Sequence, residues 1–168
     1  MTTERCGGEL DRLEKRSIEA RAIEPVIREV AARIGWDEAQ SILIQVNQDE
    51  AFRRGQRIAQ EFGGNGIVEL ARDVDGWGLG GAWEMEVLER TENTYFFNVT
   101  RCPYFELYRE LGMEELGVAL SCCRDEPFAR GFNPGLRLTR TQTIMEGADH
   151  CDFRYMLECR ETPSPLTP

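Results

Sequence analysis

The chain has 168 residues, a formal net charge of −10 and a hydrophobic fraction of 41%. This length predicts one domain with room for a hydrophobic core. The acidic balance argues against nucleic acid and anionic membrane surfaces as partners, because phosphate binding needs a basic footprint. Residues 1–15 lack the apolar segment of a signal peptide, and no run reaches the roughly 18 apolar residues of a membrane span. We therefore expect a cytoplasmic protein whose cysteines are reduced thiols.

The first half of the chain has helical periodicity. Pro25 predicts a break or a fresh start in the first helix, and Gly35 predicts its end. Asp37, with Gln40 three residues later, suggests a capping box at the start of a second helix that ends near Phe62. A third, short helix follows the glycines at 63–66. The residues expected to face inward are Ile23, Val26, Ile27, Val30, Ile34, Ala39, Ile42, Leu43, Val46, Ile58, Phe62, Ile67, Leu70, Ala71 and Val74.

The second half changes to alternation. Residues 83–89 alternate apolar side chains with glutamate, which predicts a strand with one wet face, and the aromatic and β-branched segment 94–101 predicts a second strand. The glycine-rich stretch 75–81 lacks the G-x-G-x-x-G order, so it predicts a loop and not a phosphate-binding cradle. The remaining predicted elements are helices at 103–111 and 114–121 and strands at 136–145 and 150–159.

These elements predict an α+β fold. N-terminal helices should pack on a mainly antiparallel C-terminal sheet of about four strands, with helices inserted between the strands. We expect a single domain over residues 1–160, helical at 9–75 and sheet-containing at 82–159. The proline-rich tail at 161–168 is expected to be disordered.

Cys102 is the first candidate for chemistry. It directly precedes Pro103, which suits the first position of a helix, so the cysteine should lie at the N-cap. Free amide groups and the helix dipole would lower the pKa of a thiol there. Strand alternation puts Asn98, Thr100 and Cys102 on the same side, which predicts one site on one face of the sheet. The alternative is a buried cysteine that packs as a small hydrophobic residue.

Other polar side chains follow in the same stretch of chain. Asp125 can act as a base or orient one, or it can cap a turn through Glu126 and Pro127. His150 has an unperturbed pKa near neutrality and is either an acid–base group or a solvated side chain. Arg140 and Arg154 can anchor a substrate carboxylate, or pair with acidic residues on the surface.

A zinc site must be weighed, because several residues of this stretch are zinc ligands by type. Their spacing contains no C-x-x-C pair, and the chain has no P-loop, nucleophile elbow or H-E-x-x-H motif. We therefore predict no bound metal and no organic cofactor. The residues of suitable type are Cys102, Cys122, Cys123, His150 and Cys151.

Four short motifs between residues 98 and 155 carry a resemblance to a known family. They are V-x-R-C ending at Cys102, C-x-x-D from Cys122 to Asp125, R-T-x-T with Arg140, Thr141 and Thr143, and G-x-x-x-C-D-F-R with Gly147, Cys151, Asp152, Phe153 and Arg154. In combination and order they resemble the L-2-amino-thiazoline-4-carboxylic acid hydrolases. The resemblance implies hydrolysis of a cyclic C=N bond, as in the opening of 2-aminothiazoline-4-carboxylate to N-carbamoyl-cysteine.

The resemblance also implies roles for individual residues. Attack on the ring carbon would come from the Cys102 thiolate or from a water activated near Asp125 and His150, so these three are the predicted catalytic residues. The predicted substrate-binding residues are Asn98, Arg140, Thr141, Thr143, Cys151 and Arg154. The expected partner is a small-molecule substrate with a carboxylate. The sequence does not decide whether the protein forms a homo-oligomer. Two alternatives remain, a non-catalytic small-molecule-binding or sensor module of the same fold and a zinc protein.

Overall fold

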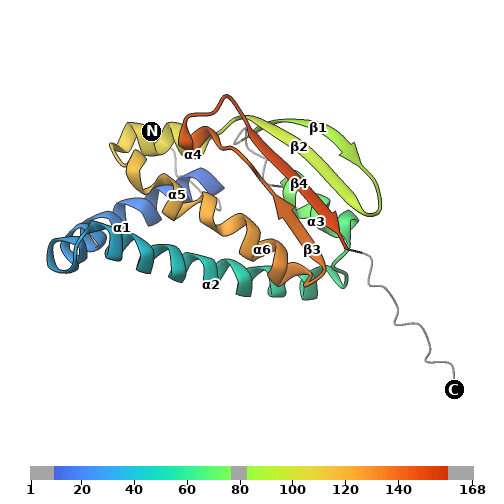
Figure 1. The fold of residues 1–168 in the computed structure, drawn as a ribbon, viewed down its shortest axis with the longest axis horizontal. Coiled ribbons are helices and arrows are strands. Elements are labelled where there is room, and N and C mark those ends of the chain that lie inside the picture. Colours follow the sequence, from blue (N-terminus) through green and yellow to red (C-terminus); the bar gives the residue numbers. More distant parts are fainter. Residues whose placement is uncertain (1–9, 77–82, 159–168) are drawn as a thin grey trace, which may run out of the picture.

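Two long helices form one side of the molecule in the computed structural model, which describes residues 10–76 and 83–158. Helix α1 (Arg12–Ile34) and helix α2 (Trp36–Phe62) lie side by side (Figure 1). Gly35 joins them with φ 95°, a conformation that favours glycine, and its amide closes α1 on the carbonyl of Ala31. Gly63 ends α2 with φ 67°, as predicted, and the short helix α3 (Ile67–Asp75) follows.

Two predictions about the ends of these helices are wrong. Helix α1 runs through Pro25 without a break, because the proline lies on the exposed side, where water can hydrate the carbonyl that loses its amide partner. Asp37 is not an N-cap, because α2 begins at Trp36 directly after Gly35. Gln40 instead donates its side-chain amide to the carbonyl of Glu115 at 3.0 Å.

Several residues predicted to face inward are exposed. The two helices bury a narrow stripe of small and aliphatic side chains, which are Ala20, Ile27, Ala39, Leu43 and Ala51. Residues a fraction of a turn outside that stripe face solvent, and they are Val26, Ile34, Ile42 and Val46. In α3, by contrast, the four residues predicted to point inward are all buried. None of the described helices has the length and apolarity needed to cross a membrane.

The sheet confirms the predicted fold class. Its strands are β1 (Glu84–Arg90), β2 (Thr94–Arg101), β3 (Leu136–Thr139) and β4 (Cys151–Leu157), in the order β1-β2-β4-β3. Every neighbouring pair is antiparallel. The sheet stands beside the helices, and α6 (Asp125–Phe132) runs between α2 and β3 (Figure 1). The fold is therefore α+β, with mostly N-terminal helices packed on a four-stranded antiparallel sheet.

Short helical segments connect β2 to β3. They are α4 (Pro103–Leu111), the 3-10 turn η2 (Glu114–Leu116), α5 (Gly117–Leu120), the 3-10 turn η3 (Cys122–Arg124) and α6. The predicted helix at 114–121 is thus divided in two. Helix α6 was not predicted, because Pro127 and Gly131 suggest a loop. Pro127 is the third helical residue, where the missing amide costs no intrahelical hydrogen bond.

The predicted strand at 136–145 is wrong beyond Thr139. The backbone amides of Thr141 and Gln142 both donate to the Asp152 carboxylate at 2.9 Å, and so they leave the ladder. A 3-10 turn, η4 (Ile144–Glu146), follows before β4. In the first strand, Val87 is 48% exposed although the alternation predicted it to be covered. It pairs with the buried Phe97 and so lies on the same face, but β1 is at the edge of the sheet. The predicted loop over residues 77–81, the predicted strand end at Cys159 and the predicted tail at 161–168 lie outside the described residues.

The inner face of the sheet forms one hydrophobic cluster with α2, α3 and α6. Its aromatic rings come from alternate positions of β2 and β4, and Phe97 stacks on Phe153 with 4.9 Å between ring centroids. A second cluster joins α1 and α2 to α4 and α5 through residues such as Leu43 and Tyr108. Alternation along β2 therefore places Tyr95, Phe97 and Val99 together on the buried face of the sheet.

Helices α2 and α6 touch backbone to backbone. A Cβ built on Gly131 would lie 2.0 Å from the carbonyl oxygen of Phe52, and one on Gly55 would lie 2.3 Å from that of Phe128. Such a contact cannot be relieved by rotating a side chain. We expect Gly131→Ala to lower the free energy of unfolding by about 3 kcal/mol, measured by urea denaturation, because the helices must separate.

The matched control is Gly76→Ala. Gly76 has a helical φ of −66° and nothing within 4 Å of an added Cβ, so its effect should stay within about 0.5 kcal/mol. Equal effects of the two substitutions would contradict the close approach of α2 and α6.

Candidate functional site

A cavity of about 670 Å³ lies between the two hydrophobic clusters. Its apolar lining includes Val99 and Phe153 from the sheet, Ala51 and Phe128 from α2 and α6, and Met145 from η4. A volume of this size suits a small organic ligand. The polar lining comes from both halves of the chain, so the cavity exists only where the helical and sheet parts meet.

Three thiols reach this cavity from different elements. Cys102 is the N-cap of α4, Cys122 begins η3, and Cys151 begins β4 opposite Val99 of β2. Each stands where a regular element begins, so the backbone turns at that point and aims the side chain inward. Asp125 and Arg140 line the same space. Four of the residues predicted for the site, Cys102, Asp125, Arg140 and Cys151, therefore converge.

Asp125 and Arg140 form an ion pair at the wall of the cavity. A guanidinium nitrogen of Arg140 donates to the Asp125 carboxylate, and its other terminal nitrogen donates to the carbonyl of Cys122 at 3.0 Å. The guanidinium also lies over the ring of Phe153, 5.2 Å from the centroid. Burial raises the pKa of Asp125 above its usual range, and Arg140 opposes that rise. The fork of Arg140 is thus occupied by the protein itself, so its main effect is to hold Asp125 in place.

The predicted acidity of Cys102 is wrong. Burial raises the pKa of its thiol to about 11, although the amides of Phe105 and Tyr104 at the start of α4 favour the thiolate. The helix N-terminus is present, as predicted, but desolvation of the sulfur outweighs it. Burial also raises the pKa of the other two cavity thiols, Cys122 and Cys151. Thiolate formation in this cavity therefore needs a base or a bound ligand.

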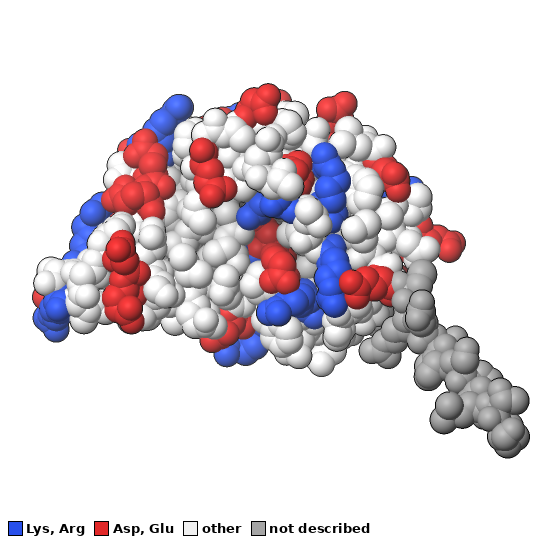
Figure 2. All heavy atoms as spheres, in the orientation of Figure 1, with Lys and Arg blue, Asp and Glu red and all other residues white. Residues whose placement is uncertain are grey.

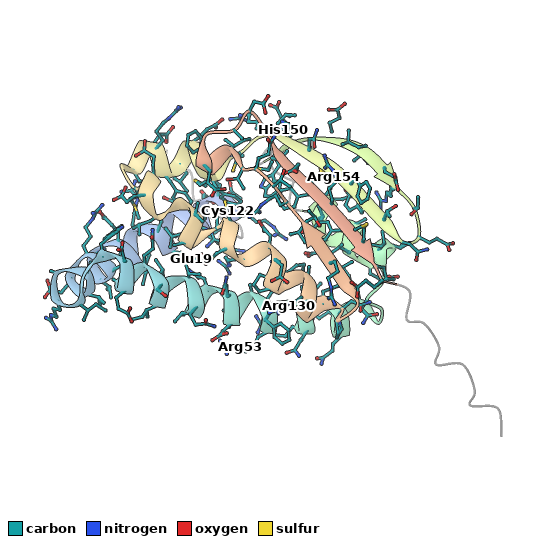
Figure 3. The ribbon with its side chains drawn as sticks, in the orientation of Figure 1. Glu19, Arg53, Cys122, Arg130, His150 and Arg154 are labelled. Carbon is teal, nitrogen blue, oxygen red and sulfur yellow. The ribbon has the colours of Figure 1, made fainter. Side chains whose placement is uncertain are left out.

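Asn98 and Arg154 lie on the opposite face of the sheet. Arg154 donates to the carbonyl of Phe97 at 2.8 Å and to the side-chain oxygen of Asn98 at 2.9 Å, and it lies over the ring of Phe96. Figure 3 shows Arg154 on the sheet, well apart from Cys122. The predicted shared side fails because β2 ends at Arg101, so its alternation does not extend to Cys102.

The structure places His150, Thr141 and Thr143 in the connection between β3 and β4, outside the lining of the cavity. His150 contacts the carboxylate of Asp149 at 2.6 Å, and Figure 3 shows it at the edge of the molecule. The hydroxyl of Thr141 donates to Asp152 at 2.7 Å, and Thr143 caps the turn η4. The side chains of these three residues therefore stabilise the β3–β4 connection and do not face the cavity.

No sequence pattern identified the arginines of the cavity. Arg16 on α1, Arg54 on α2 and Arg124 in η3 all line it. On an amphipathic helix an arginine is normally assigned to the solvent face, and nothing in the spacing of Arg16 or Arg54 separates a cavity from bulk water. Among the described residues, no group of three or more His, Cys, Asp or Glu side chains is arranged to hold a metal ion.

Comparisons with known proteins add two findings. A family model described as L-2-amino-thiazoline-4-carboxylic acid hydrolase matches residues 15–155. A crystal structure of the phenol-responsive sensory domain of the transcription activator PoxR with phenol is similar, with a TM-score of 0.53 and 12% sequence identity over 90% of this chain and 78% of that chain. At that identity the similarity concerns the fold. A comparison with curated protein sequences gives no match.

Proposed function

The chain belongs to the L-2-amino-thiazoline-4-carboxylic acid hydrolase family, and from this membership we propose that it hydrolyses a C=N bond of a small cyclic carboxylate. The named family substrate, 2-aminothiazoline-4-carboxylate, is the first compound to test. The observation that supports this most is that Cys102, Asp125, Arg140 and Cys151 line one cavity of a size suited to such a molecule.

In this proposal Cys102 is the nucleophile. Its proton passes to Asp125, whose pKa is raised by burial, which makes this carboxylate a stronger base than an exposed one. The thiolate forms a bond to the ring carbon between nitrogen and sulfur, and the ring sulfur leaves and takes up the proton. Water then adds to the same carbon and Cys102 departs as the free thiol, which leaves a urea. Arg140 holds the base in position.

A second route keeps the same residues but changes the nucleophile. Asp125 removes a proton from water, the hydroxide adds to the ring carbon, and collapse expels the ring sulfur as a thiol. Both routes consume one water and yield the same product. The two are separated by a substitution of Cys102, which is treated in the Discussion.

The test of the proposed function is the ring opening itself. Purified protein is incubated with 2-aminothiazoline-4-carboxylate, the protein is removed, and the new thiol and N-carbamoyl-cysteine are measured by thiol titration and mass spectrometry. We expect many equivalents of product per protein chain, well above the rate in buffer. Saturable binding of the compound with no product beyond the buffer rate would overturn the hydrolase proposal.

The alternative function is a small-molecule-binding or sensor module. The fold similarity to a phenol-responsive sensory domain favours it, as does burial of the thiols, which raises the pKa of Cys102 to about 11. Binding without turnover, together with a change in protein conformation or assembly on binding, would support this alternative.

A further inference from the structure

The charge of the cavity is opposite in sign to that of the chain. The formal net charge is −10, and the face drawn in Figure 2 mixes acidic and basic side chains without an extended basic patch. The cations that line the cavity nevertheless outnumber the carboxylates. The cations are Arg12, Lys15, Arg16, Arg54, Arg124 and Arg140, and the carboxylates are Asp11, Glu19 and Asp125.

Three of these arginines keep charge or hydrogen-bonding capacity that the described residues do not satisfy. Arg16 contacts Glu19 at 2.8 Å and donates to the carbonyl of Leu120 at 3.3 Å, but its Nε is buried and makes no hydrogen bond within the part of the chain that the structure describes. Arg54 contacts the carboxylate of Asp73 only at 3.7 Å, beyond the length of a hydrogen bond. The backbone amide of Arg124 donates to the carbonyl of Ser121, but its guanidinium makes no hydrogen bond or ion pair with any residue in 10–76 or 83–158. Guanidinium groups are normally paired when they are removed from water.

The same three arginines repel one another. Burial lowers the pKa of Arg124, and the neighbouring charges of Arg16 and Arg54 lower it further, against the attraction of Glu19. Burial also lowers the pKa of Arg54. Arginine stays protonated in proteins, so this arrangement concentrates positive charge at the cavity and costs stability. A bound anion would relieve that cost.

The arginines also adjoin the groups proposed to react. Arg124 is two residues from Cys122 and directly precedes Asp125. Arg16 lies over the ring of Tyr104, 5.7 Å from the centroid, and Tyr104 is two residues after Cys102. A small molecule whose anionic group meets these arginines can therefore present its ring to Cys102 and Asp125.

We propose that Arg16, Arg54 and Arg124 form an anion-binding subsite that holds the carboxylate of the ligand. Helices α1 and α2 and the turn η3 supply this subsite, whereas α4, α6 and β4 supply the reacting groups. Arg140 is not part of it, because Asp125 and the carbonyl of Cys122 occupy its guanidinium. The assignment rests on the proposed function in taking this cavity as the substrate site.

Binding measurements on the full chain test the subsite. The Cys102→Ser variant, which prevents attack by this thiol, is titrated calorimetrically with 2-aminothiazoline-4-carboxylate and with its uncharged carboxamide. We expect the carboxylate to bind at least about tenfold more tightly, as a charge-assisted hydrogen bond implies. Adding Arg124→Gln or Arg16→Gln should remove most of that preference.

The matched control is Arg53→Gln. Arg53 is the neighbour of Arg54 on α2, is paired with Glu50, and lies on the outer side of the helix away from the cavity (Figure 3). This substitution should leave the preference for the carboxylate unchanged. A preference that survives both Arg124→Gln and Arg16→Gln would overturn the subsite.

A second measurement does not depend on the shape of the ligand. At low ionic strength we expect Arg124→Gln to melt at a higher temperature than the wild type, because it removes an unpaired cation, and to gain less from added sulfate. If neither thiazoline probe binds and sulfate stabilises both proteins equally, the subsite is wrong. If the carboxylate preference is present and depends on Arg124 but no product forms, the hydrolase proposal fails and the subsite stands.

Discussion

Replacing Cys102 with serine is expected to reduce turnover of 2-aminothiazoline-4-carboxylate by roughly 10³-fold or more, because the proposed nucleophile is removed. The fold should remain, since Cys102 is the N-cap of α4 without a side-chain capping bond and serine is a favourable residue at that position. Circular dichroism and thermal melting check the fold, and product formation checks the rate. A variant that turns over substrate at the wild-type rate would move the mechanism to water activated by Asp125.

The ionisation of Cys102 gives an independent check. A pKa of about 11 leaves roughly one thiol in ten thousand ionised at pH 7 in the free protein. Alkylation of Cys102 by iodoacetamide, followed by peptide mass spectrometry, should therefore be slow at pH 7 and rise about tenfold per pH unit towards pH 10. A rate that is already constant between pH 6 and 8 would mean that the helix N-terminus, and not burial, dominates at this sulfur.

Breaking the pair between Asp125 and Arg140 is expected to destabilise the protein by about 3 kcal/mol for either Asp125→Asn or Arg140→Gln. Both side chains are less than a fifth exposed, so each single substitution leaves its partner's charge shielded from water and unpaired. The double variant should lose clearly less than the sum of the two single losses, because no unpaired charge remains. Urea denaturation of the four proteins measures this coupling.

The control is a pair of the same chemistry on the surface. Arg33 and Glu29 lie one turn apart on α1 and are 74% and 64% exposed. Substitution of either should change the free energy of unfolding by less than about 1 kcal/mol. Additive losses at Asp125 and Arg140, of the size seen at the surface pair, would mean that the ion pair is hydrated and does not hold the base.

Much of the fold follows from local signals in the sequence. Glycines at 35 and 63 ended helices, and alternation in the segment 94–101 predicted a strand and separated its two faces. The errors arose where a distant partner replaced a local preference. Asp152 captures two amides that would otherwise extend β3, and Gly131 lies within α6 because its lack of a side chain allows close packing on α2. Neither partner can be found from the neighbouring residues.

Some residues of the candidate site could be predicted from the sequence and others could not. Cys102, Asp125, Arg140 and Cys151 converge because the motifs place them at or near the ends of elements, where the chain turns towards the cavity. For residues within a strand, alternation decides which face of the sheet a side chain occupies. Because β2 ends at Arg101, this alternation does not relate Asn98 to Cys102, and the two lie on different sides. The arginines of α1 and α2 could not be identified as cavity residues without the tertiary structure, because only the packing of the two halves distinguishes a cavity wall from a solvated helix face.

The walls of the cavity come from both ends of the described chain, from α1 to β4. A ligand that binds only this native arrangement is linked to the folding equilibrium of the entire chain. At a hundredfold excess over its dissociation constant it would add about 2.7 kcal/mol to the free energy of unfolding. Slowed amide hydrogen exchange would then extend from the first helix to the last strand, even though the ligand touches few of those residues. A bound ligand would therefore stabilise the packing of the helical half of the molecule against the sheet.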